Sequence, residues 1–168
     1  MTDTLAQLHA DIDARVDSIC AEHSDWLCRK GCDGCCHRLA DIPKLTAAEW
    51  ELLQQGLAAL PAAHLSAISA GFAALATQTT RPLTCPLLAD GLCSVYAYRP
   101  VACRSYGFYM QRGLGLYCKD IEARVADGAW ATVVWGNHDA LDRRLAALGE
   151  SRELTAWFAD WQAGVDRA

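Results

Sequence analysis

Cysteines are the residues of this 168-residue chain whose type and spacing point most directly to chemistry. Eight of the nine fall into two groups, one in a short loop and one spread over a later segment: Cys28, Cys32, Cys35 and Cys36, then Cys85, Cys93, Cys103 and Cys118. Thiolates are soft donors that suit zinc, Cu(I) and iron–sulfur clusters. Four of them complete a tetrahedral zinc site or hold a [4Fe–4S] cluster. The spacing therefore predicts a metal ion or cluster as the ligand, with the number of centres open.

Disulfides are the competing use of so many cysteines. The N-terminal segment has neither a basic region nor an apolar core of the kind that marks a secretory signal peptide. We therefore expect a cytoplasmic protein with reduced thiols, in which clustered cysteines read as metal-binding or catalytic. The net charge of −5 and the lack of a basic stripe argue against a nucleic-acid partner, and no apolar run is long enough to span a membrane.

The neighbours of the cysteines suggest how a metal site would be built. Adjacent side chains diverge, so at least one of Cys35 and Cys36 is expected to meet thiols of the second group. Tyrosine and phenylalanine rings interleave with the later cysteines and can exclude water. Hydrogen-bond donors near the sulfurs would tune a bound cofactor, and the candidates are Arg99, Arg104 and Tyr106. The all-sulfur ligand set and the aromatic cover favour iron–sulfur over zinc, without excluding zinc.

Two further residues, His37 and Cys20, are of types that can bind metal. His37 directly follows the cysteine loop, and imidazole is a common metal ligand, so its role as a ligand stays open. Cys20 stands apart from both groups on the apolar stripe of an expected helix, and we expect it to be a buried thiol of the core.

The elements that must position these residues are mostly helices. We expect a single domain over residues 1–168, mostly α, with about five helices around an irregular cysteine-rich metal-binding core at about 28–118. Apolar periodicity and capping signals predict helices at about 4–22, 46–60 and 61–77, a short helix carrying Cys103, and C-terminal helices within about 137–163. Strand signals are few, and the best is at 131–135.

The cysteine pattern resembles a known family. The carrying residues are the double cysteine, the pair Cys85-Pro86, the final Cys118 and the segment Cys93-x2-Tyr96-x2-Arg99-Pro100-x2-Cys103-Arg104-x-Tyr106. Together they look like the YkgJ-like cysteine-cluster family, a zinc- or iron-chelating domain similar to the cysteine domain of flagellin lysine methylases. The resemblance implies metal binding. It leaves open a redox or electron-transfer protein, a structural zinc module for protein interaction, or a methylase-like enzyme, and no catalytic residue is identified.

Two shorter motifs match other families only in part. The spacing of Cys28, Cys32 and Cys35 also occurs in radical S-adenosylmethionine enzymes, but the alternating strands and helices of their barrels are not predicted here. The run Gly136-Asn137-His138-Asp139 resembles one motif of binuclear metallophosphoesterases, whose other motifs are missing. We expect this run to begin a helix, with Asn137 or Asp139 as its N-cap.

Overall fold

The computed structural model describes residues 4–165, which divide into two compact units. Unit 1 contains the residues up to Lys30 together with Val101–Gly149. Unit 2 contains Gly31–Pro100 and the residues from Glu150 onward. Each unit has a cluster of buried apolar side chains of its own. The single domain over 1–168 stays a prediction.

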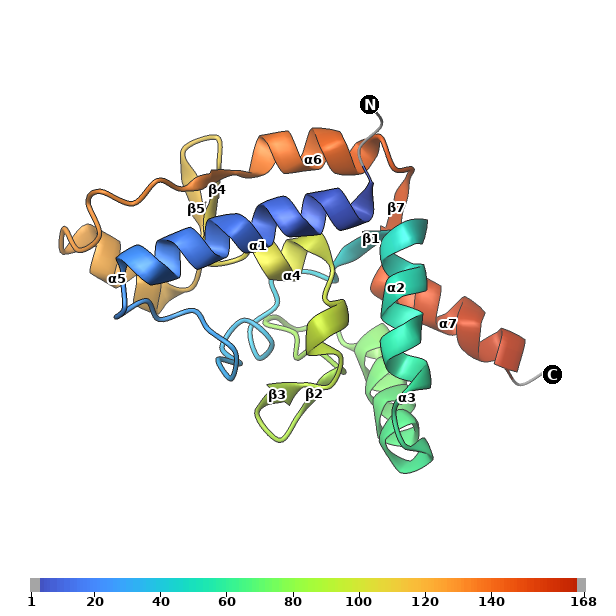
Figure 1. Cartoon of the computed structure of the whole chain (residues 1–168). Coiled ribbons are helices and arrows are strands. Elements are labelled where there is room, and N and C mark those ends of the chain that lie inside the picture. The colour runs from blue at the N-terminus through green and yellow to red at the C-terminus, as the bar shows by residue number, and fades with distance from the viewer. Residues whose placement is uncertain (1–3, 166–168) are drawn as a thin grey trace. The chain divides into compact units, whose positions relative to one another are not determined.

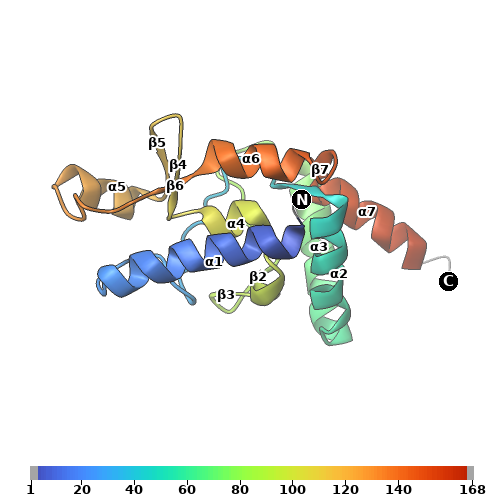
Figure 2. The ribbon, with the colours of Figure 1, turned by 45° about the horizontal axis from the view of Figure 1, so that its top comes forward.

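Unit 1 is built on a long N-terminal helix. Helix α1 lies alongside α4 and α6, as Figures 1 and 2 both show. A small sheet of order β5-β4-β6 completes the unit, with β4 antiparallel to β5 and parallel to β6. The elements of unit 1 are α1 (Leu5–Glu22), α4 (Val101–Ser105), β4 (Tyr109–Gln111), β5 (Leu114–Leu116), α5 (Lys119–Ala126), β6 (Gly136–Asn137) and α6 (His138–Ala146).

The sequence of α1 explains both where it begins and which face it buries. The Thr4 side chain accepts a hydrogen bond from the backbone N–H of Gln7 at 3.2 Å and so caps the first turn. Leu8 and Ile12 recur at helical spacing and are fully buried. They pack in a cluster with other buried residues of unit 1, namely Ile19, Trp26, Val101, Phe108, Tyr109 and Leu141. The predicted helix at 4–22 is confirmed.

Unit 2 combines three α-helices with two short antiparallel strand pairs, β1 with β7 and β2 with β3. Thr46 and Glu49 form a capping box at the start of α2, as their spacing predicts. The rings of Phe72 on α3 and Phe158 on α7 stack with centroids 4.0 Å apart and join these helices. The elements are β1 (Lys44–Thr46), α2 (Ala47–Ala58), α3 (Ala62–Thr77), β2 (Leu88–Ala89), β3 (Leu92–Cys93), the 3-10 helix η1 (Tyr96–Tyr98), β7 (Ser151–Glu153) and α7 (Leu154–Val165).

The mostly helical class is confirmed, with seven α-helices among residues 4–165. The strand predicted at 131–135 is wrong: those residues form a turn and irregular chain, and the strand is Gly136–Asn137. The β-branched run is short, and backbone pairing with β4 begins only at Gly136, whose lack of a side chain leaves room for the Tyr109 ring. No helix among the described residues combines the length and apolarity of a membrane span.

His9 is a buried titratable group inside unit 1. It is 8% exposed, and its Nε2 atom is buried without a hydrogen-bond partner in the described structure. Burial lowers the pKa of His9 from 6.5 to about 4, and the charge of Arg104 lowers it further while Asp13 opposes the change. Between about pH 6.5 and pH 4, His9 is therefore protonated in the unfolded chain but neutral in the folded chain. Stability is lost as the pH falls from about 7 to 4, and the loss levels off below pH 4.

We predict that His9→Leu removes this part of the acid sensitivity. The pKa difference corresponds to about 3 kcal/mol between pH 7.5 and pH 4. Urea unfolding of both proteins at a series of pH values measures it. As the pH falls, the free energy of unfolding of His9→Leu should decrease less than that of the parent. Equal pH dependence in the two proteins would show that His9 titrates normally in the fold.

Candidate metal centre

Backbone hydrogen bonds in unit 2 bring the cysteine loop next to the start of the second cysteine group. Leu39 and Leu83 form an isolated antiparallel bridge with two N–H···O bonds of 2.9 Å. Beyond this bridge, two residues after Leu83, the N–H of Cys85 donates to the carbonyl of Cys36 at 2.7 Å. The loop itself is a tight turn in which the N–H of Cys36 donates to the carbonyl of Asp33 at 2.9 Å. The main chain therefore fixes Cys36 beside Cys85.

A hairpin brings the next cysteine to the same place. Strands β2 and β3 pair antiparallel, with Leu88 opposite Cys93. The turn between them is at Asp90-Gly91, as the sequence predicts, and both residues have positive φ. The N–H of Leu88 also donates to the carbonyl of Cys85 at 3.1 Å. Cys85 and Cys93 thus lie at the two sides of one small hairpin, and both pack against the apolar cluster of unit 2.

The pKa values of these thiols show that they interact. A hydrogen bond from Cys36 lowers the pKa of Cys35 to about 6, against the opposing effect of burial and with help from Arg99. Burial raises the pKa of Cys85 to about 11, and negative charge on Cys93 and Cys35 adds to the increase. The pKa of Cys93 is raised by burial too, and Cys35 contributes. The expected meeting of the double cysteine with the second group stays a prediction, and the charge effect of Cys35 on Cys85 and Cys93 agrees with it.

Arg99 is the cation of this thiol group. Its guanidinium carbon lies 3.6 Å from the centroid of the Tyr96 ring, and its Nε donates to the Tyr96 carbonyl at 3.0 Å. These contacts fix the direction of the side chain. The positive charge helps to lower the pKa of Cys35 and partly offsets the increase that burial causes in the pKa of Cys93, and so favours the thiolate form that binds metal. The arrangement suits the supporting role that the sequence suggests for Arg99.

The remaining predicted ligands of the second group lie in unit 1, together with Cys28. Cys103 is on α4 and Cys118 is the N-cap of α5, and both are half-buried. The Sγ atom of Cys28 lies 3.6 Å from the carbonyl oxygen of Tyr106, so the backbone of Tyr106 contacts a predicted ligand. Arg104 donates from Nη1 to both carboxylate oxygens of Asp13, at 3.1 and 3.3 Å.

Three other cysteine-loop and core residues have different surroundings. Cys32 is exposed, whereas Cys20 is half-buried against the apolar cluster of unit 1. Nε2 of His37 lies 3.1 Å from Oδ2 of Asp33, and about half of the His37 side chain is exposed. Within residues 4–165 no three His, Cys, Asp or Glu side chains converge into a closed metal site, and none of the nine cysteines, all in that range, forms a disulfide.

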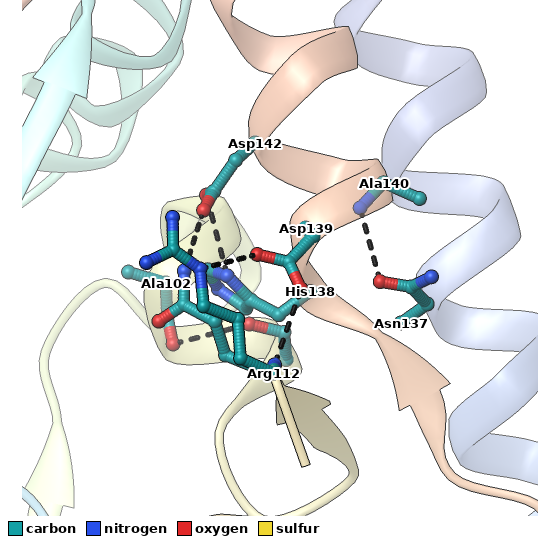
Figure 3. A network of polar contacts seen from close by, with 9 residues as sticks. Ala102, Arg112, Asn137, His138, Asp139, Ala140 and Asp142 are labelled. Atoms are coloured by element: carbon teal, nitrogen blue, oxygen red, sulfur yellow. Dashed lines mark hydrogen bonds and ion pairs between the residues drawn. The ribbon is translucent and has the colours of Figure 1, made fainter. Parts of the chain in front are cut away.

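The run Gly136-Asn137-His138-Asp139 has a structural use, which Figure 3 shows. Asn137 is the N-cap of α6 and accepts from the N–H of Ala140 at 3.2 Å, as predicted. Asp139 accepts from the N–H of Arg112 at 3.1 Å, and Nδ1 of His138 lies 3.2 Å from Oδ1 of Asp142. The Asp139 contact ties α6 to the turn after β4, and the other two contacts lie within α6 and its cap. Together they account for the motif that resembles a phosphoesterase.

The donor chemistry of both units fits a thiophilic metal. Half-buried sulfur atoms, a thiol with a depressed pKa and a fixed guanidinium form a better environment for a sulfur-ligated metal than for a hard cation that prefers oxygen. No curated protein and no solved structure matches the chain. A family model does match residues 27–127; it is the CxxCxxCC model, described as "Putative zinc- or iron-chelating domain". The chain therefore belongs to this family of metal-chelating cysteine domains.

Proposed function

We propose that the clustered cysteines bind iron as an iron–sulfur cluster, and that the protein has a redox or electron-transfer role in the cytoplasm. The proposal is carried by the backbone bond that places Cys36 beside Cys85 in unit 2. The charge effects of Cys35 and Cys93 on Cys85, and of Cys35 on Cys93, support it. Packing of the apolar core alone does not require cysteines from distant segments to lie close together. A cytoplasmic location keeps them reduced. An iron–sulfur cluster supplies reversible one-electron chemistry when bound.

The roles of the chain's own residues follow from their positions. Cys35, Cys36, Cys85 and Cys93 are the proposed ligands of unit 2, with Cys32 at the exposed side of the same loop. In unit 1 the proposed ligands are Cys28, Cys103 and Cys118. Arg99 offsets thiolate charge in unit 2. Burial of Cys85 and Cys93 shields the sulfurs from water, which protects a cluster and shapes its potential.

Zinc is the second candidate, and the four-thiol set of unit 2 supports it. Four cysteine sulfurs are a common ligand set of structural zinc sites, which stabilise small folds and are redox-inert. In that case the chain would serve as a structural module for protein interaction. Colour and redox behaviour separate the two metals without any change to the protein.

We predict that protein purified without oxygen contains tightly bound metal, and that this metal depends on the gathered thiols. Iron with acid-labile sulfide and broad visible absorption is the expected result; colourless protein with zinc would support the second candidate. Cys85→Ala should lose at least half of the metal, measured by elemental analysis. Metal-free parent protein that is fully folded would contradict the proposal.

The matched control for Cys85→Ala is Cys20→Ala. Both substitutions remove a thiol that packs against an apolar cluster, but Cys20 lies outside the two cysteine groups. Cys20→Ala should keep its metal and lose at most about 1–2 kcal/mol of stability. Equal metal loss in both variants would mean that the ligand set has been drawn wrongly.

We predict that Arg99→Gln weakens metal binding about five- to tenfold, because a fixed positive charge beside the thiolates is worth about 1 kcal/mol. Arg99→Lys, which keeps the charge, should recover part of the loss. Competition with a chelator measures the affinity, and for an iron–sulfur cluster the reduction potential of Arg99→Gln should become more negative.

A second arginine of unit 2 provides the control for this charge effect. Arg152 also lies over an aromatic ring, with its guanidinium carbon 4.5 Å from the Trp157 centroid, but it pairs with Asp160. Arg152→Gln therefore removes a stacked cation without touching the thiol group, and its metal affinity should equal that of the parent. If both glutamine variants bind metal equally well, the charge of Arg99 has no part in the site.

A further inference from the structure

A glycine lies against one of the proposed ligands in unit 1. Gly107 is in the turn between α4 and β4 and has φ +91°. A Cβ atom at this position would lie 2.8 Å from Sγ and 2.9 Å from Cβ of Cys28. Both distances are shorter than carbon and sulfur atoms tolerate, so the Cys28 side chain occupies space that any other residue at 107 would fill.

The turn has little freedom to move away from Cys28. The N–H of Gly107 donates to the carbonyl of Leu116 at 2.7 Å, and the N–H of Phe108 donates to the carbonyl of Ser105 at 3.1 Å. The next ring, that of Phe108, is buried in the apolar cluster of unit 1, and Cys28 packs against the same cluster. A side chain at 107 would therefore displace the thiol rather than the main chain.

We infer that Gly107 is a positioning residue for Cys28. The Tyr106–Gly107 backbone forms a cradle in which the carbonyl of Tyr106 contacts Sγ, and the missing side chain of Gly107 lets the thiol rest against the main chain. The inference rests on the proposed function only for its consequence, which is that the cradle holds Cys28 in the place from which it binds metal. The cradle itself is a property of the protein without metal.

Two other glycines separate this role from backbone strain. Gly113 and Gly128 have φ values of +79° and +82°, close to that of Gly107, but a Cβ at either would meet no atom within 4 Å. Alanine at any of the three positions forces an ordinary residue into the left-handed region. Only alanine at 107 also pushes a methyl group into the Cys28 thiol. The three variants thus share the strain and differ in the contact.

The experiment compares Gly107→Ala with Gly113→Ala and Gly128→Ala in the full chain. Alkylation of each cysteine in metal-free protein is followed by mass spectrometry, and zinc and ferrous iron affinities are measured by chelator competition. Gly107→Ala should change the alkylation rate of Cys28 at least about fivefold and weaken metal binding at least about fivefold, whereas the two controls should match the parent within about twofold. Unchanged Cys28 reactivity in Gly107→Ala, or the same change in all three variants, would overturn the inference.

A second pair of variants covers the outcome in which Gly107→Ala does not fold. Cys28→Gly removes both atoms that the new methyl group would meet, so Gly107→Ala should lower Tm by less than half as much in the Cys28→Gly background as in the parent. An equal loss of Tm in both backgrounds would also refute the cradle. If the parent protein binds no metal, the proposed function fails, while the alkylation and Tm measurements still decide whether Gly107 positions Cys28.

Discussion

The candidate site depends on one constraint of the main chain, namely the pairing of the cysteine loop with the segment that precedes the second cysteine group. The Leu39–Leu83 bridge and the bond from Cys85 N–H to the Cys36 carbonyl connect stretches of chain separated by two helices. Helices α2 and α3 return the chain toward its starting point, at an entropic cost that grows only slowly with loop length. Cys36 and Cys85, distant in sequence, become neighbours in the main chain because backbone bonds, not the thiols, determine the register.

Placing several thiols close together is electrostatically unfavourable once they ionise, and the neighbours of Cys35 partly compensate for this. Burial, and after it the negative charge of neighbouring thiols, raises the pKa values of Cys85 and Cys93, so these thiols resist ionisation. The hydrogen bond from Cys36 and the charge of Arg99 act in the other direction on Cys35. A bound metal cation would offset the same repulsion much more strongly, since it replaces the thiol protons with positive charge. The proximity of cysteines from distant segments is therefore better explained by metal binding, the property that describes the family, than by ordinary packing.

Local signals in the sequence predicted the helices well and the long-range contacts poorly. The apolar stripe of α1 and the Thr46/Glu49 capping box of α2 indicated these helices because both signals act over a few turns of one helix. Helix α5 was not expected because Cys118, its N-cap, makes no side-chain capping bond. Among the site residues, the sequence indicated the cysteines and Arg99 through their types and spacing. The contact between Gly107 and Cys28 joins residues far apart in the chain, and only the fold reveals it.

X-ray absorption at the metal edge of anaerobically purified protein tests most directly whether cysteine sulfur binds metal in this chain. We expect a first shell made of sulfur, at about 2.3 Å for zinc or iron, with an additional iron–iron shell if the metal is an iron–sulfur cluster. A first shell of nitrogen and oxygen, or metal at trace levels in folded protein, would show that the cysteines do not bind metal.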